Sequence, residues 1–145
     1  MTAEKKDKCG VFGIWGSPDA AHITFAAMYA QQHRGQESAG IAVSDGNELS
    51  AHVGMGLVPE VFSGRVLDGL KGHAAIGHNR YSTTGSNKNC NAQPLLEEYV
   101  GGQVALGHNG NLINASLLRR DYEERGHIFH TSTDTDVILH LLASP

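Results

Sequence analysis

The order of hydrophobic and polar positions along the chain predicts several strands. The predicted strands cover residues 9–15, 38–44, 48–53, 72–78 and 103–107. The first of them, Cys9 to Trp15, is apolar at almost every position, which is typical of a strand buried on both faces. Asp45-Gly46 stands between the second and third strands and predicts a hairpin that joins them.

Helical spacing of apolar residues alternates with these strands. The predicted helices cover residues 20–33, 59–70, 114–125 and 134–143. Ser17-Pro18-Asp19 has the composition of a helix start, and the first helix is expected to end near Arg34-Gly35. Asn114 is expected to cap the third helix, and Gly126 to stop it. Residues 84–93 are polar and without periodicity, so they are predicted to form a loop.

Strands joined by short turns dominate the first half of the chain. This order favours antiparallel sheets with helices packed against them, an α+β class, over alternating parallel units. The 145 residues suffice for one domain with a hydrophobic core. No internal repeat or linker-like segment divides the chain.

Composition and charge narrow the classes of function. With a net charge of −4, the chain has no excess of basic residues, so it is not expected to bind nucleic acid. No apolar run approaches the ~18 residues of a membrane span, so no membrane partner is expected. The two cysteines, Cys9 and Cys90, are too few for a disulfide framework and indicate a reducing, cytoplasmic compartment.

Cys9 is the candidate nucleophile. Cleavage of the Lys8–Cys9 bond would leave one residue with both a thiol and a free α-amine. The α-amine titrates near ~7.7–8.0 and the thiol near ~8.5, so the amine can accept the thiol proton. Such a pair is a known solution for acyl transfer. Residues 1–8 are therefore predicted to be a propeptide, whereas the ordinary alternatives are a frayed terminus and a buried structural cysteine.

Four polar clusters follow the predicted strands and helices. They are residues 32–37, 78–83, 107–111 and 131–136. Each cluster alone is weak evidence, because such residues also form turns and ion pairs. Nine histidines, including His127 and His130, suggest a metal site, but no cysteine or carboxylate completes a recognisable zinc spacing. No metal ligand is therefore predicted.

Five motifs resemble a known family when they are taken in order. They are Cys-Gly-Val-Phe-Gly, Gln-His-Arg-Gly-Gln-Glu-Ser-Ala-Gly-Ile, Asn-Arg-Tyr-Ser-Thr, Gly-His-Asn-Gly-Asn-Leu and Ser-Thr-Asp-Thr-Asp. Together they resemble the amino-terminal glutaminase domain of amidophosphoribosyltransferases, which are class II glutamine amidotransferases. The resemblance runs from Cys9 to about Leu142. It implies a glutamine amidotransferase domain over residues 9–145, which is expected to be partial.

The resemblance implies an N-terminal-nucleophile hydrolase fold, an αββα sandwich of two antiparallel sheets between helical layers, incomplete at the carboxy terminus. It also implies that Cys9 hydrolyses glutamine to glutamate and ammonia. In the parent enzymes, a separate domain uses the ammonia to convert phosphoribosyl pyrophosphate to 5-phosphoribosylamine. That reaction is the first step of purine biosynthesis.

The resemblance also assigns roles to single residues. Arg80 corresponds to the arginine that binds the α-carboxylate of glutamine, and Thr83 to a further hydrogen bond to the substrate. Asp134 corresponds to the acid that accepts the α-ammonium group. A bidentate guanidinium suits the first of these roles.

The remaining assignments concern the reacting amide. Asn109 and Gly110 correspond to the oxyanion-binding pair, a side-chain amide and a backbone N–H. Arg34 and Gly35 correspond to a loop beside the nucleophile. On general chemistry alone, Asn109-Gly110 could be only a turn.

Cofactors and partners follow from the same resemblance. No cofactor is expected in this segment, whereas the full-length parents use Mg²⁺ and often carry a 4Fe–4S cluster. Such parents are expected to be homo-oligomers. Three alternatives remain open: another class II glutamine amidotransferase, an inactive glutamine-binding fragment, and a histidine-based metal-binding protein.

Overall fold

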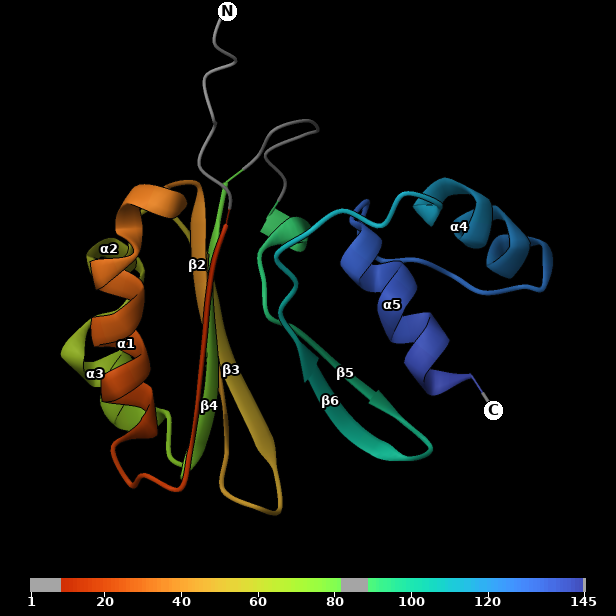
Figure 1. The fold of residues 1–145 in the computed structure, drawn as a ribbon. Coiled ribbons are helices and arrows are strands. Elements are labelled where there is room, and N and C mark those ends of the chain that lie inside the picture. The colour runs from red at the N-terminus through yellow and green to blue at the C-terminus, as the bar shows by residue number, and fades with distance from the viewer. Residues whose placement is uncertain (1–8, 82–88, 145) are drawn as a thin grey trace, which may run out of the picture.

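The computed structural model describes residues 9–81 and 89–144 (Figure 1). Two sheets lie face to face, and helices cover the outer face of each. The predicted α+β class with two antiparallel sheets between helical layers is confirmed. The predicted propeptide, residues 1–8, and Thr83 lie outside the described residues.

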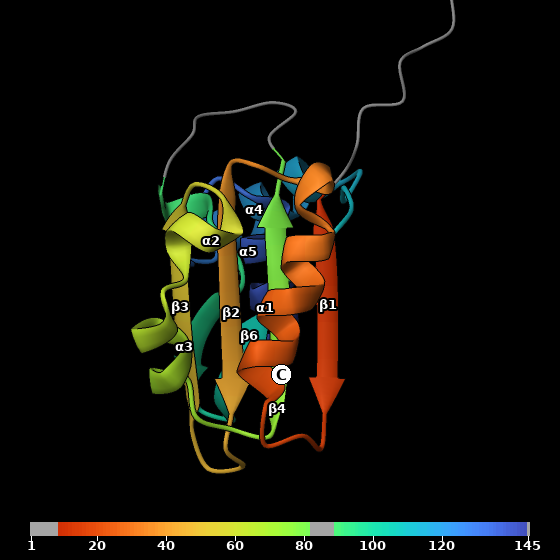
Figure 2. The ribbon, with the colours of Figure 1, turned by 90° about the vertical axis from the view of Figure 1, so that its left-hand side faces the viewer.

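The first layer of the molecule is a four-stranded sheet with helices on one face. Its strands are β1 (Gly10–Trp15), β2 (Ser38–Ser44), β3 (Leu49–Met55) and β4 (Ala74–Arg80). Its helices are α1 (Ala20–Ala30), the 3₁₀ turn Gln32–Arg34, α2 (Val58–Val61) and α3 (Gly64–Gly69). The strand order is β1-β4-β2-β3, and every neighbouring pair is antiparallel. Figure 2 shows α1 over β1 and β4, with α2 beside it over β2 and β3.

Alternation along each strand divides the first sheet into two faces. Ile41 and Ala75 point toward the helices and belong to the apolar core, as does Met28 of α1. Gly77 lies under α1, where a Cβ atom would meet the side chains of Thr24 and Met28. A glycine at this position therefore lets the helix approach the sheet closely.

The second layer is smaller. It contains the hairpin of β5 (Leu95–Tyr99) and β6 (Gly102–Leu106), followed by α4 (Ala115–Glu124) and α5 (Asp134–Ala143). A short 3₁₀ turn, Asn89–Asn91, precedes the hairpin. In Figure 1, α5 lies outside the hairpin and α4 lies beyond α5. The loop before the hairpin approaches the first sheet at Gly40, where a Cβ atom would overlap the carbonyl oxygen of Gln93.

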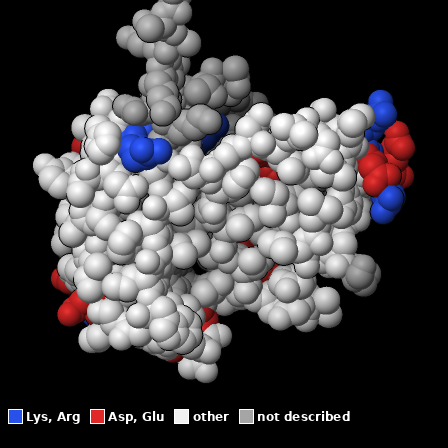
Figure 3. Space-filling model, in the orientation of Figure 1, with Lys and Arg blue, Asp and Glu red and all other residues white. Residues whose placement is uncertain are grey.

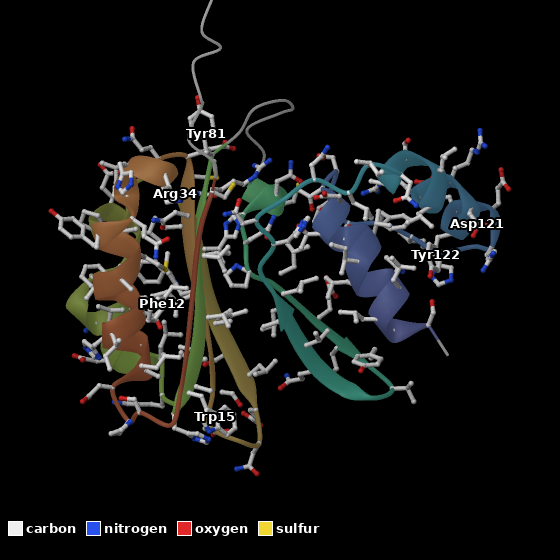
Figure 4. The ribbon with its side chains drawn as sticks, in the orientation of Figure 1. Phe12, Trp15, Arg34, Tyr81, Asp121 and Tyr122 are labelled. Atoms are coloured by element: carbon white, nitrogen blue, oxygen red, sulfur yellow. The ribbon has the colours of Figure 1, made fainter. Side chains whose placement is uncertain are left out.

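The prediction that β1 is buried on both faces was wrong. Trp15 is 79% exposed, and exposed or half-buried positions follow Gly10 along the whole strand. The reason is that β1 is an edge strand, whose face toward the second sheet is only partly covered. Figure 4 shows Phe12 on the side of the helices and Trp15 at the far end of the strand.

Two predicted helices are divided in the structure. The predicted helix 20–33 ends as an α-helix at Ala30 and continues as a 3₁₀ turn. The predicted helix 59–70 is two short helices, because Ser63 begins the second one by accepting a hydrogen bond from Val66 N. Asn114 makes no side-chain cap, contrary to prediction, whereas Gly126 adopts the positive φ expected after α4.

One strand boundary and one whole strand also differ from the prediction. β4 ends at Arg80 and not at position 78. β5 was not predicted, because its sequence Leu-Leu-Glu-Glu-Tyr does not alternate between apolar and polar residues. The predicted hairpin at Asp45-Gly46 is confirmed, with Asn47 N and Glu48 N both donating to the Asp45 carboxylate.

An open cavity of about 540 Å³ lies between the two sheets near Trp15. Ala42 and Ile76 border it from the first sheet, and Val104 and Ala105 border it from β6. Within the described residues, no helix is both long enough and apolar enough to cross a bilayer.

Candidate active site

A second cavity lies at the opposite end of the sheets from Trp15, where the strands β1 and β4 carry Cys9 and Arg80. Its volume is about 260 Å³, near the lower end of the ~300–1,000 Å³ typical of small-molecule sites. The residues that line it are Cys9, Arg80, Tyr81, Gln93, His108, Gly110, Asn111, Ala115, Ser132, Thr133 and Asp134. The cavity therefore joins segments from both layers and can hold a ligand the size of an amino acid.

Cys9 stands immediately before β1. Its sulfur accepts a hydrogen bond from the backbone N–H of Tyr81 at 3.3 Å, and it also lies 3.6 Å from the carbonyl oxygen of Tyr81. The residue is half buried and forms no disulfide. Pairing between β1 and β4 thus places the sulfur beside the end of β4 and holds it with a backbone donor.

Arg80 ends β4 and points to the same face as Cys9. Its Nη1 donates to Glu37 Oε1 at 2.9 Å, and both side chains are only 11% exposed. A guanidinium has five N–H donors, so the pair with Glu37 leaves donors for a second carboxylate. Glu37 also fixes the backbone here, since its own N–H donates to Arg80 O.

The turn that follows β6 carries Asn109 and Gly110. Gly110 lies against the imidazole of His108, where a Cβ atom would approach Nε2 closely. The backbone N–H of His108 donates to Gln93 Oε1 at 2.8 Å. His108 O accepts a hydrogen bond from His78 Nε2 at 3.0 Å. Asn109 itself is exposed beside the cavity.

Asp134 is the first residue of α5. Its Oδ2 accepts a hydrogen bond from Leu112 N at 2.7 Å, and its Oδ1 lies 3.6 Å from His108 Nδ1. The side chain is 17% exposed. A carboxylate has about four acceptor positions, so Asp134 retains capacity for a cationic ligand group.

The structure therefore brings four of the predicted site residues to one cavity: Cys9, Arg80, Gly110 and Asp134. Asn109 lies between two residues that line it. Arg34 and Gly35 are not among the lining residues, and Gly35 instead lets its segment pack directly against the backbone of Asn79 and Arg80.

The sequence did not indicate the roles of three residues whose side chains are mostly covered, Glu37, His78 and Gln93. Glu37 pairs with Arg80. Gln93 accepts a hydrogen bond from the His108 N–H in the turn after β6, and His78 donates one to the His108 carbonyl of the same turn. Burial lowers the pKa of His78 from 6.5 to about 4, partly opposed by its hydrogen bond to the His108 carbonyl. Glu37 and His78 belong to the polar clusters noted in the sequence, but no spacing indicated these contacts.

Charge on the visible face of the molecule is sparse. Figure 3 shows mostly uncharged atoms, with charges of both signs gathered at the margin where α4 lies. The ion pair Arg125–Asp121 lies at the carboxy-terminal end of that helix. Tyr81 and Arg34 lie at the same end of the sheets in Figure 4, and Asp121 and Tyr122 lie on the far side of the second layer.

Metal ligands are not grouped in the described part of the chain. Over residues 9–81 and 89–144, no three His, Cys, Asp or Glu residues are arranged to hold a metal ion. His127 Nδ1 and His140 Nδ1 are 3.0 Å apart and form a hydrogen bond with each other, so these two nitrogens are not directed at a shared metal ion. A 4Fe–4S cluster held by four cysteines does not fit a chain with two.

Comparison with known proteins defines the class. A family model described as "Glutamine amidotransferase domain" matches residues 63–144, which is more than half of the chain. The chain therefore belongs to the glutamine amidotransferase domain family.

The similar full-length proteins are more specific. The chain is 50% identical over 146 residues to the amidophosphoribosyltransferase of Bacillus subtilis, covering 98% of this chain and 31% of that protein. It is 48% identical to the amidophosphoribosyltransferase of Methanothermobacter thermautotrophicus, covering 97% of this chain and 30% of that one. The chain thus spans about a third of the length of these relatives.

Solved structures agree with the sequence comparison. The structure described as the allosteric regulatory enzyme of purine biosynthesis superposes with a TM-score of 0.89 at 49% identity, covering 93% of this chain and 29% of that one. A glutamine phosphoribosylpyrophosphate amidotransferase from B. subtilis, complexed with ADP and GMP, gives 0.86 at 48% identity. The prediction of an N-terminal-nucleophile hydrolase fold is confirmed.

Proposed function

We propose that this chain is the glutaminase part of an amidophosphoribosyltransferase and that Cys9 is its nucleophile. The observation that carries the proposal is one cavity in which a thiol, a guanidinium and a carboxylate converge: Cys9, Arg80 and Asp134. A free amino acid needs one cation and one anion for its two charged ends. The thiol and the adjacent turn that carries Asn109 and Gly110, called the oxyanion turn below, then remain for its side-chain amide.

The reaction begins when the Cys9 sulfur attacks the side-chain amide carbon of glutamine. The carbon–sulfur bond forms as the carbonyl electrons move to oxygen, and Asn109 and Gly110 donate hydrogen bonds to the resulting oxyanion. The proton from the thiol passes through the α-amine of Cys9 to the leaving nitrogen, and ammonia departs. Water then attacks the thioester and releases glutamate and the free thiol.

Arg80 and Asp134 supply orientation in this scheme. Arg80 binds the substrate α-carboxylate through donors that Glu37 does not use, and Asp134 accepts the α-ammonium group. Thr83 adds a further hydrogen bond to the substrate, and Arg34 and Gly35 shape the loop beside the nucleophile. Holding the amide at attack distance from the thiol accounts for much of the rate in such reactions.

The whole protein is proposed to transfer the ammonia to phosphoribosyl pyrophosphate and form 5-phosphoribosylamine, the first step of purine biosynthesis. That step needs residues other than those of this chain. The whole protein is proposed to bind Mg²⁺ and a 4Fe–4S cluster, also through residues other than those of this chain. A cytoplasmic homo-oligomer is proposed on the same grounds. The support is the 48–50% identity to amidophosphoribosyltransferases.

The test starts with the mass of the purified whole protein and its release of ammonia from glutamine. We expect loss of residues 1–8, which exposes the Cys9 amine, and glutamine-dependent ammonia release. Cys9→Ser should lower that release by at least ~10³-fold, because the hydroxyl is a far weaker nucleophile than the thiol. Cys90→Ser is the matched control, since Cys90 is exposed and lies outside the cavity.

Two results would overturn the proposal. A processed protein that binds glutamine without releasing ammonia would be an inactive glutamine-binding module. Full ammonia release by Cys9→Ser would place the nucleophile elsewhere.

A further inference from the structure

His78 is buried at the centre of the first sheet, close to the active site but outside its cavity lining. It is 0% exposed, and its strand neighbours are Val11 on β1 and Gly40 on β2. Alternation along β4 directs its side chain toward the second layer. Gly107 lies directly over it, where a Cβ atom would contact the imidazole ring at 3.8 Å.

The hydrogen bond of His78 defines its tautomer. A carbonyl oxygen can only accept, so Nε2, which is 3.0 Å from His108 O, carries the proton and donates it. Nδ1 is buried and has no hydrogen-bond partner among the described residues. The ring is therefore neutral, in agreement with the pKa of His78, which burial lowers to about 4.

The acceptor of this bond belongs to a critical peptide unit. The His108 carbonyl and the Asn109 N–H share one planar peptide group, so fixing the carbonyl fixes the plane that leads into Asn109. The preceding peptide plane is fixed as well, because His108 N–H donates to Gln93 Oε1. Gln93 Nε2 in turn donates to Thr135 Oγ1, at 2.9 Å, next to Asp134.

The oxyanion turn, residues 107–110, has little other support from packing. Asn109 and Gly110 are both exposed, and neither belongs to the apolar core. Buried polar side chains thus hold the turn from the first sheet through His78 and from the second layer through Gln93.

We propose that His78 is a positioning residue for the oxyanion turn, acting through its hydrogen bond to the His108 carbonyl and not through contact with substrate. It aims the Asn109 side chain and the Gly110 N–H at the oxygen that becomes negative when the Cys9 sulfur attacks. This inference rests on the proposed glutaminase function. A displacement of about 1 Å at such a site can cost ~10²-fold in rate.

The test compares three variants in the whole protein. His78→Leu removes the donor, His78→Gln places an amide N–H near the original Nε2 position, and His52→Leu is the matched control on β3. His52 lies on the face toward the helices, where its ring contacts Phe62. Three readouts are used. The first is amide hydrogen exchange of segment 107–112, and the second is kcat and KM for glutamine. The third is the rate of thiol alkylation by iodoacetamide, a reaction that needs no oxyanion site.

For His78→Leu we expect faster exchange of segment 107–112 and a kcat lower by about 10- to 100-fold. KM and the alkylation rate should stay within about twofold, because Arg80, Asp134 and Cys9 are untouched. His78→Gln should recover most of both losses, and His52→Leu should match the wild type in each. Should His78→Leu fail to fold, His78→Asn replaces it, since its amide is too short to reach the carbonyl.

Unchanged exchange of segment 107–112 in a folded His78→Leu overturns the inference whatever the activity. So does a glutamine variant that behaves like the leucine variant, or a parallel fall of kcat and alkylation rate. A wild-type protein that releases no ammonia overturns the proposed function instead, and the exchange data then decide the positioning role alone.

Discussion

The two layers of the molecule are each stabilised by a different kind of interaction. The first layer buries a continuous apolar cluster between α1, α2, α3 and the sheet, with members such as Met28, Ile41 and Val58 at 0–1% exposure. The second layer buries fewer apolar side chains. Near the site it depends on hydrogen bonds between buried polar groups, such as Gln93 to Thr135.

The proposed substrate-binding groups are divided between these layers. Cys9 and Arg80 come from the first sheet, whereas Gly110 and Asp134 come from the second layer. The contacts that join the layers at the site are polar, as in the bond from His78 to His108. Apolar packing gives stability without directing single atoms, and hydrogen bonds fix direction at little net gain in stability. The difference suggests that stability and alignment of the site can be perturbed separately.

The largest expected effect comes from the apolar core. Ile41→Ala should lower the free energy of unfolding by about 2–5 kcal/mol, because it leaves a cavity in close-packed surroundings. Leu139→Ala in α5 is the counterpart and should lie at the low end, since Leu139 already borders a void of about 150 Å³. Thermal unfolding of the whole protein measures both. Equal losses of unfolding free energy in the two variants would contradict the difference between the layers.

Acid should loosen the junction between the layers through His78. Its pKa is about 4 in the folded state against 6.5 when unfolded, so its contribution to stability is complete above pH 6.5 and is lost as the pH falls toward 4. Between pH 7 and pH 5 the opening free energy of β4 should fall by about 2 kcal/mol. Hydrogen exchange of residues 74–80, corrected for intrinsic rates, measures it.

The control for acid loosening is His78→Gln, which should remove most of this dependence. A smaller dependence should remain in α5, because burial also lowers the pKa of His140. A His78→Gln protein with the full wild-type pH dependence would show that the titrating group lies elsewhere.

Two buried threonines offer a matched comparison of hydrogen bonding. Thr135 and Thr24 are both 0% exposed, but Thr135 accepts a bond from Gln93, whereas the Thr24 hydroxyl has no partner among the described residues. Thr135→Val should cost about 1–3 kcal/mol and lower kcat for glutamine. Thr24→Val should be neutral or slightly stabilising. Equal costs in urea unfolding would contradict the difference.

The smallest effect is expected on the surface of α4. Arg125 pairs with Asp121 at 2.7 Å, with side chains 64% and 48% exposed. Arg125→Ala should cost only about 0.3–0.5 kcal/mol and leave kcat unchanged. A loss above 1 kcal/mol in thermal unfolding would mean that this face is more than a solvated surface.

Much of the fold could be predicted because its signals are local. Asp45-Gly46 specifies a hairpin through turn chemistry, and apolar spacing identifies α5 over Asp134–Ala143. The burial of β1 could not be predicted, since an edge strand and a central strand of the same composition look alike. β5 was missed because its two adjacent glutamates hide the alternation.

The site was predictable only in its residue types. The motifs indicated Cys9, Arg80 and Asp134, and the structure places them in one cavity. Contacts such as Arg80 with Glu37 depend on the register between strands, which no sequence spacing encodes. The bond from His78 to His108 spans 30 positions and two sheets, so only the folded chain reveals it.

The exposure of Trp15 has an optical consequence. It is the only tryptophan in the 145 residues, and it borders the cavity between the sheets at the end remote from Cys9. Its indole packs edge-on against His73 at 5.3 Å and is otherwise largely open to water. Its fluorescence emission should therefore lie at long wavelength and shift to the blue when any segment covers this face. The chain thus carries an intrinsic reporter on the part of its sandwich that residues 9–81 and 89–144 leave open.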